Sequence, residues 1–129
     1  MKRNPALQPL SREHHTALTL AKACERAARS GVAEQVSAAC QRAIRAYAIE
    51  LEPHFLIEEQ SLLPLLESAE TQRLVQRTLA DHQQLQALLK DLQQSNAYAL
   101  ERFGACLSAH VRFEERELFP ALESVLTPR

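Results

Sequence analysis

Apolar residues recur three and four positions apart along four long stretches of the chain. This spacing places them on one face of an amphipathic α-helix. The predicted helices run from a cap at Ser11 to about Arg29, from about Ala33 to Leu66, from just after Ser68–Thr71 to about Gln94, and from a cap at Ser95 or Asn96 to a frayed end at Thr127. Short connections between four such helices predict an all-α fold, an up-down-up-down antiparallel four-helix bundle.

Individual residues add detail at the helix ends and within the second helix. The Ser11 hydroxyl is expected to cap the first helix, with Glu13 in the first turn, where the helix dipole favours an anion. Gly31 suits the left-handed conformation that often ends a helix. Pro53 lacks a backbone N–H and is expected to bend the second helix just before His54.

Length and composition limit the domain organisation and the location. The 129 residues predict a single domain over residues 1–129, whose bundle covers about residues 10–126 after a short N-terminal lead-in. Only two glycines occur and 46% of the residues are apolar, which favours helices in a globular protein. No apolar run approaches the roughly 18 residues of a membrane-spanning helix, and no signal-peptide hydrophobic region follows the first residues. The cytoplasm is therefore the expected location.

Charge and cysteine usage exclude several classes of site. The net charge is −1 and no long run of lysine or arginine occurs, so neither nucleic acid nor a membrane surface is an expected partner. Cys24, Cys40 and Cys106 form no Cys-x-x-Cys motif, which argues against a disulfide framework and against a cysteine zinc site. We expect the cysteines to pack as small core residues.

One stretch of the chain occurs twice. Residues 54–67 recur as residues 110–123, and the two copies align without a gap. Their shared frame is H-x3-E-E-x2-L-x-P-x-L-E. In each copy the histidine and the first glutamate are four positions apart, so both lie on one face of a helix, one turn from each other.

The apolar face of each predicted helix contains one histidine near its middle. These histidines are His14 (with His15 as the alternative), His54, His82 and His110. In a bundle they should meet Glu58 and Glu114 at one level. Burying such groups costs on the order of several kcal/mol unless they are paired, and Glu–His pairs would satisfy some of them. Neutral imidazole suits Fe, Zn, Cu or Ni, and carboxylate adds Mn and hard cations. Two carboxylates from opposite helices can bridge two metal ions.

These residues resemble the hemerythrin (HHE cation-binding) family from about Leu10 to Leu126. The matching motifs are His14, His54-x3-Glu58, His82 and His110-x3-Glu114, with the frame H-x3-E-E-x2-L-x-P around the second and fourth. The resemblance implies a non-haem centre of two Fe ions, joined by oxo or hydroxo and carboxylate bridges, inside a four-helix bundle; Mn or Zn is the alternative. It assigns Glu58 and Glu114 as the bridges and the four histidines as terminal ligands.

The chain departs from the oxygen-carrying hemerythrins in two places. Those proteins have a His-x3-His pair on the third helix, whereas the residue four positions after His82 is Gln86. Their last carboxylate follows its histidine by five positions, which corresponds here to Glu115 instead of Glu114. The doubled glutamates resemble the broader bacterial HHE proteins. The helical period favours Glu114 as the ligand, which leaves Glu59 and Glu115 as solvated or outer groups.

Fewer histidine ligands would leave a coordination position open to a small molecule. We therefore expect a protein that binds or senses O2, peroxide or NO, or that takes part in iron or redox-stress handling, rather than an enzyme. The alternatives are a di-iron enzyme that consumes peroxide or repairs iron–sulfur clusters, and a regulatory module held together by metal. Cys106 lies one turn before His110 and is either a redox-sensitive thiol near the metals or a core residue.

Overall fold

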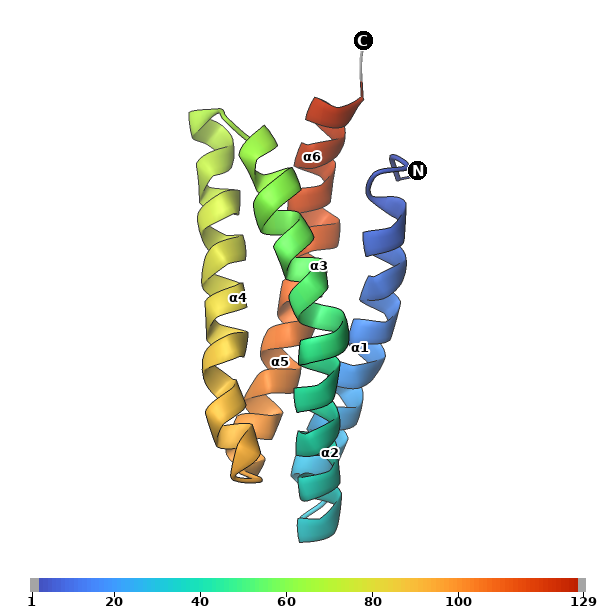
Figure 1. Cartoon of the computed structure of the whole chain (residues 1–129), viewed down its shortest axis with the longest axis vertical. Helices are drawn as coiled ribbons and strands as arrows, with labels where there is room; N and C mark the ends of the chain where they lie inside the picture. Colours follow the sequence, from blue (N-terminus) through green and yellow to red (C-terminus); the bar gives the residue numbers. More distant parts are fainter. Residues whose placement is uncertain (1–2, 128–129) are drawn as a thin grey trace.

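The computed structural model describes residues 3–127, which form four long helical segments and no strand (Figure 1). The first is α1 (Gln8–Arg29), and the third is α4 (Gln72–Gln93), which follows the 3₁₀ turn η4 (Ala69–Thr71). The second, called the α2–η3 segment, joins α2 (Ala33–Ala46), the π turn η1 (Tyr47–Leu51), α3 (Glu52–Ile57), the π turn η2 (Glu58–Leu62) and the 3₁₀ turn η3 (Leu63–Leu65). The fourth, called the α5–α6 segment, joins α5 (Ala97–Phe113), the π turn η5 (Glu114–Leu118) and α6 (Phe119–Leu126). The predicted all-α fold is confirmed.

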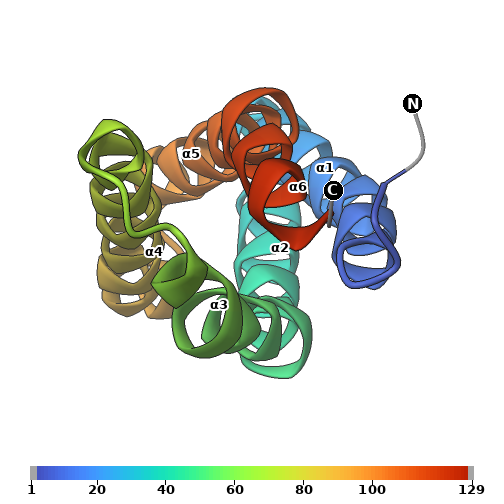
Figure 2. The ribbon, with the colours of Figure 1, turned by 90° about the horizontal axis from the view of Figure 1, so that it is seen from above.

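The chain reverses direction at the end of each segment. Figure 1 shows it descending along α1, ascending through α2 and α3, descending along α4 and ascending through α5 and α6. Seen from above, the segments follow one another around the molecule in chain order (Figure 2). Segments that follow one another in the chain therefore lie side by side, and α1 also lies beside the α5–α6 segment.

Two apolar clusters fill the interior. The larger contains Leu20, Tyr47, Phe55, Leu85, Phe103 and Leu107 among others, and the smaller contains Leu7, Leu10, Leu62, Leu118, Phe119 and Leu122 among others. Most of the buried polar side chains are histidines and glutamates. Polar groups buried in this way need partners, because an unpaired polar group in the core is costly.

The predicted cap of the first helix is wrong. The helix begins at Gln8, one turn earlier than expected, because Pro9 is compatible with the first turn of a helix. The Ser11 hydroxyl caps nothing and donates a hydrogen bond to Glu115 Oε2 (2.8 Å). Glu13 consequently lies beyond the first turn, too far along α1 for the expected dipole contribution. At the other ends the predictions are confirmed: Gly31 is left-handed (φ 72°), and Asn96 caps α5 by accepting a hydrogen bond from the Ala99 N–H.

Besides Pro9 in the first turn of α1, three prolines lie inside the helical segments, and a π turn precedes each of them. The residue just before Pro53, Pro64 and Pro120 donates its N–H to a carbonyl five positions back instead of four. Proline lacks an N–H and its ring collides with the carbonyl four positions back, and the wider turn accommodates both defects. The π turns η2 and η5 begin at Glu58 and Glu114, the same position of the repeated stretch.

The helices α1 and α5 approach each other closely at Gly104. A Cβ atom at this position would lie 2.7 Å from the Ala21 carbonyl oxygen and 2.8 Å from Glu25 Cγ. The absence of a side chain at residue 104 therefore sets the distance between the two helices. None of the helices in residues 3–127 has the combination of length and apolarity needed to cross a membrane.

Candidate metal centre

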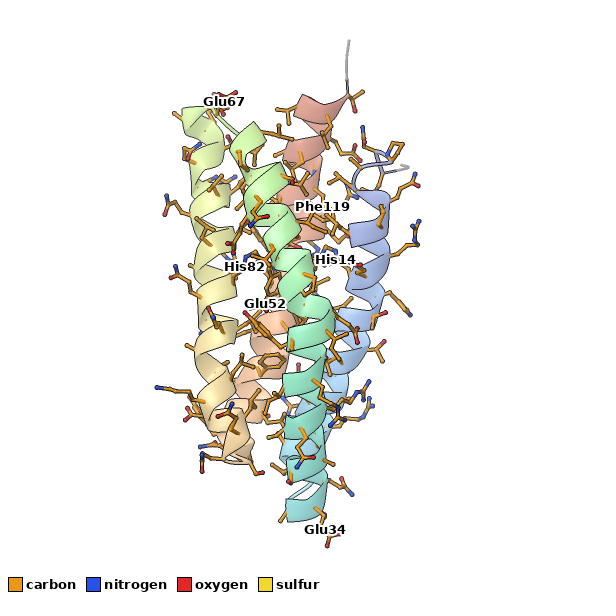
Figure 3. All side chains as sticks on the ribbon, in the orientation of Figure 1. His14, Glu34, Glu52, Glu67, His82 and Phe119 are labelled. Atoms are coloured by element: carbon orange, nitrogen blue, oxygen red, sulfur yellow. The ribbon has the colours of Figure 1, made fainter. Side chains whose placement is uncertain are left out.

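Each helical segment contributes one buried histidine to the interior. His14 comes from α1, His54 from α3, His82 from α4 and His110 from α5. Figure 3 labels two of them, which lie at the same level on opposite sides of the bundle. Glu58 and Glu114, at the starts of two π turns, are completely buried among them.

These six side chains form two groups that could each hold a metal ion. The first group is His14, His54, Glu58 and Glu114, and the second is His82, His110, Glu58 and Glu114. Within each group the possible ligand atoms all lie within 4.8 Å of one another. Both groups share both glutamates, so any two ions held there would be neighbours.

Each inner carboxylate directs one oxygen to each histidine pair. The contacts are Glu58 Oε2 to His54 Nε2 (3.0 Å), Glu58 Oε1 to His82 Nε2 (3.0 Å), Glu114 Oε1 to His14 Nε2 (2.7 Å) and Glu114 Oε2 to His110 Nε2 (3.0 Å). The ring centroids are 5.1 Å apart in the His14–His54 pair and 5.0 Å apart in the His82–His110 pair. The two halves of the site are therefore alike.

One contact at the centre lacks the geometry of a hydrogen bond. His110 Nε2 and Glu114 Oε2 are 3.0 Å apart and fully buried, yet neither has a hydrogen-bond partner among the described residues. Two unpartnered polar atoms in the core are costly unless a third group satisfies both. A cation accepting the lone pairs of an imidazole and a carboxylate fits this position, and the donor set suits a first-row transition metal.

The two buried carboxylates favour positive charge on the histidines beside them. Burial alone would lower the pKa of His54, but its contacts with Glu114 and Glu58 raise that pKa to about 11. Glu114 and Asp81 likewise overcome the effect of burial at His110 and raise its pKa to about 10. Without metal, protons on His54 and His110 therefore supply positive charge that a metal ion would supply when bound.

The two inner glutamates differ in their charge environment. Burial and the charge of Glu114 raise the pKa of Glu58. Burial would also raise the pKa of Glu114, but the attraction of His110 and the contacts with His14 and His54 lower it well below the usual range. In the metal-free site Glu114 therefore holds its negative charge more strongly than Glu58 does.

The outward-facing nitrogen of each histidine also meets a carboxylate. The Nδ1 contacts are His14 to Glu115 (2.6 Å), His54 to Glu13 (2.7 Å), His82 to Glu59 (2.7 Å) and His110 to Asp81 (2.8 Å). In each copy of the repeat, the first glutamate contacts the inner nitrogen (Nε2) of a histidine on another segment. The second glutamate contacts the outer nitrogen (Nδ1) of that same histidine. Glu58 and Glu59 bracket His82 in this way, and Glu114 and Glu115 bracket His14 likewise.

The structure brings together all six residues expected as ligands: His14, His54, Glu58, His82, His110 and Glu114. His15 is exposed on α1 and belongs to neither group, and Glu115 lies behind an imidazole rather than in either group. Sequence reasoning missed Glu13 and Asp81. Each immediately precedes an inward histidine, and this shared acid–histidine pair is the pattern that could have revealed them.

Aromatic and aliphatic side chains enclose the polar centre. Phe55 stacks on His82 with ring centroids 3.9 Å apart, and Phe119 stacks on His14 at 5.0 Å. A cavity of about 470 Å³ between α1 and the α2–η3 segment reaches the centre. It is lined by His14, His54 and His110, by apolar residues that include Ala17, Leu20, Ile49, Leu51 and Val111, and by Arg42, Arg45 and Glu50.

The cysteines lie outside both groups of possible ligands. Cys24 and Cys40 are buried in the larger apolar cluster, and both thiols are free. Burial raises the pKa of Cys24 to about 12, so this thiol stays protonated. Cys106 is partly buried against the same cluster, and burial raises its pKa as well. These surroundings favour the expected packing role over a reactive thiol.

The comparison with known protein families gives one match. The sequence model of the family described as the hemerythrin HHE cation binding domain matches residues 6–123. No curated protein and no solved structure matches the chain. The matched range includes every residue of the two groups described above.

Proposed function

This chain belongs to the hemerythrin HHE cation-binding family, and we propose that it holds two iron ions between its helices and binds O2, peroxide or NO there. Cation binding follows from the family and from the buried groups of histidine and glutamate. The iron pair, the small ligand and a role in iron or redox-stress handling are our proposal. It includes the up-down-up-down antiparallel order, supported by the chain path in Figure 1, and a cytoplasmic location, expected from composition.

One observation carries the two-ion proposal. Each inner carboxylate presents one oxygen to the His14–His54 pair and the other to the His82–His110 pair. A carboxylate shared in this way between two ions is a bridge, and paired bridging carboxylates with histidines are typical of di-iron sites inside helical bundles. The arrangement supports an ion in each group rather than one ion at the centre.

The surroundings of the site suit a small uncharged ligand. Bound iron would supply an open coordination position and reversible electron transfer, because each group offers fewer protein donors than octahedral iron accepts. The imidazole Nε2 atoms would hold the ions, and the stacked rings of Phe55 and Phe119 limit the entry of water to two of the histidines. The cavity beside α1, apolar along most of its wall, gives a diatomic molecule a way to the His14–His54 side.

Metal analysis of aerobically purified protein tests the proposal. We expect about two irons per chain and the near-ultraviolet absorption of an oxo-bridged pair. In Glu58→Gln both ions should be lost together. The substitution replaces one of the two carboxylate oxygens with an amide nitrogen, and the resulting side chain can no longer bridge two ions. Glu117→Gln, on the same π turn as Glu114 but paired with Arg73 at the surface, is the control and should keep both.

Other outcomes would contradict specific parts of the proposal. Zinc as the bound metal would exclude iron, and loss of a single ion from Glu58→Gln would exclude the bridging role. A spectrum that changes reversibly when oxygen is removed favours carriage or sensing. Sustained consumption of peroxide would instead favour the alternative of a di-iron enzyme.

A further inference from the structure

We infer that four outer carboxylates, from Glu13, Glu59, Asp81 and Glu115, position the four metal-facing imidazoles, each acting on the histidine of the next helical segment around the bundle. The inference rests on the proposed metal centre. It assigns a role to residues that belong to neither group of possible ligands.

The four contacts form a closed circuit. Glu13 of α1 reaches His54 of α3, and Glu59 of η2 reaches His82 of α4. The circuit is completed from α4 to α5 by Asp81 and His110, and from η5 back to α1 by Glu115 and His14. Each segment therefore supplies one acid and receives one, and every contact crosses between two segments.

The chemistry of the imidazole ring explains what these contacts do. A neutral imidazole carries its proton on one nitrogen only, and the other nitrogen keeps the lone pair that binds a metal. A carboxylate beside Nδ1 accepts the Nδ1–H hydrogen bond, so the lone pair is on Nε2, the atom that faces the centre. The same bond fixes the rotation of the ring. Four such bonds present four donor atoms to the ions in a single tautomer.

The four carboxylates are not equally well supported. Glu115 also accepts hydrogen bonds from Ser11 (2.8 Å) and Arg3 (3.0 Å), and Asp81 accepts one from Arg77 (3.1 Å). Within residues 3–127, the only side-chain hydrogen bond of Glu13 is with His54, and the only one of Glu59 is with His82.

Exposure follows the same division. The side chain of Asp81 is 18% exposed and that of Glu115 31%, against 36% for Glu59 and 56% for Glu13. Water competes more effectively for the more exposed carboxylates. Each group of ligands therefore contains one histidine whose outer carboxylate is better supported, His14 or His110. The outer carboxylate of the other histidine, His54 or His82, is more exposed.

Zinc binding measures the effect of the outer carboxylates. We would titrate metal-free native protein, Glu115→Gln, Glu115→Ala and Glu13→Ala with Zn²⁺, using Glu117→Ala as the matched control. Loss of a contact behind a metal-bound histidine typically weakens metal binding by about 10–100-fold. We expect Glu115→Ala to lie in that range, Glu115→Gln to lose less because its amide oxygen still accepts the hydrogen bond, and Glu13→Ala to lose least.

Ring-nitrogen NMR of the zinc-loaded protein separates positioning from general loss of structure. Zn²⁺ is diamagnetic, so the ¹⁵N signals of each histidine can be followed. Glu115→Gln should shift the Nδ1 signal of His14 and leave the other three histidines at their native positions. This readout needs only the conservative variant, so it decides the matter even where Glu115→Ala fails to fold.

The outcomes distinguish the inference from the proposed metal centre. If native protein binds no Zn²⁺ or Fe²⁺, the metal centre and the positioning circuit are both wrong. If native protein binds metal but Glu115→Gln and Glu115→Ala match Glu117→Ala in affinity and in the His14 signals, only the circuit is overturned. A shift spread over all four histidines would also overturn it, since each carboxylate should act on one ring.

Discussion

Adjacent residues at this site have opposite surroundings. His14 is buried, stacked on Phe119 and in contact with two glutamates, whereas His15 is exposed on the outer face of α1. Neighbouring positions on an α-helix point in directions about 100° apart, so only one of them can face the centre. The position on the helix, rather than the type of residue, determines which histidine can be a ligand.

Separate alanine variants test this difference. His14→Ala removes a donor atom from one group, and we expect its Zn²⁺ affinity to fall further than the roughly 10–100-fold of an outer contact. His15→Ala should bind Zn²⁺ like the native protein. Isothermal titration of both metal-free variants measures the affinities, and a loss of metal binding in His15→Ala would show that the ligand assignment on α1 is wrong.

The inner residues of the site could be predicted from the sequence, whereas two of the four outer carboxylates, Glu13 and Asp81, were missed. Helical period alone places His54 and Glu58 on the buried face, because both belong to one helix. The contact between Glu13 and His54 joins two helices, and its existence depends on how each helix is rotated and how far apart they lie. Sequence periodicity indicates which face of each helix is buried, but not the exact rotation and separation that bring a residue of one helix against a residue of another.

At the scale of elements, proline produced a different local structure from the one expected. A bend was predicted before His54, and the structure contains the π turn η1, which ends at Leu51, two residues before Pro53. The π turn η2 matters more for the site, because it begins at Glu58 and carries the next glutamate as well. The helix limits themselves were predicted closely, except at the start of α1, where Pro9 lies inside the first turn.

The contact between α1 and α5 gives a prediction about stability. Gly104→Ala places a methyl group 2.7 Å from a backbone oxygen of α1, and overpacking of this kind costs about 1–3 kcal/mol. The better helix propensity of alanine returns up to about 1 kcal/mol, so we expect a net loss and a melting temperature lower by several degrees. Thermal unfolding followed by circular dichroism measures the change.

A neighbouring position serves as the control for this variant. Ala105 is exposed on the same helix, so Ala105→Gly reports the propensity difference without a packing effect. If Gly104→Ala melts above the native protein, by an amount similar to the loss in Ala105→Gly, then α1 can move away from α5 at no cost and the close approach does not limit stability.

For the whole molecule, the charge state of the centre couples stability to pH. Without metal, the pKa values of His54 and His110 are about 11 and about 10, well above the roughly 6.5 of an unfolded histidine. A raised histidine pKa contributes stability that is complete below pH ~6.5 and is lost as the pH rises through the folded value. The raised pKa of Glu58 acts in the same direction, because its protonated form is favoured in the folded protein.

Metal-free protein should therefore become less stable as the solution becomes alkaline. We expect its melting temperature to fall steadily between pH 7 and pH 10, with at most about 1.4 kcal/mol lost per pH unit for each additional proton held by the folded state. Metal-loaded protein is the comparison, since its imidazoles are already neutral and it should not show this loss. A metal-free melting temperature that rises over the same interval would contradict the protonated state of the buried histidines.

Removing the metal should have a measurable effect at neutral pH as well. An ion that binds only the folded chain stabilises it by an amount that grows with the logarithm of its concentration over the dissociation constant, about 2.7 kcal/mol at a hundredfold excess. We expect chelated protein to melt below metal-loaded protein and to recover when Fe²⁺ is returned under anaerobic conditions. Equal melting temperatures would show that no ion binds preferentially to the folded chain, which would contradict the proposed metal centre.

The contacts of Arg3 have a practical consequence. Its guanidinium donates to Glu115 and lies over the ring of Phe119, and both of these side chains contact His14. A purification tag fused before Met1 would therefore lie close in sequence to Arg3, which holds two side chains that contact the ligand His14. A tag at the carboxyl terminus leaves Arg3 undisturbed. Removing the tag with protease before the assay also avoids counting metal bound by the tag as metal bound at the centre.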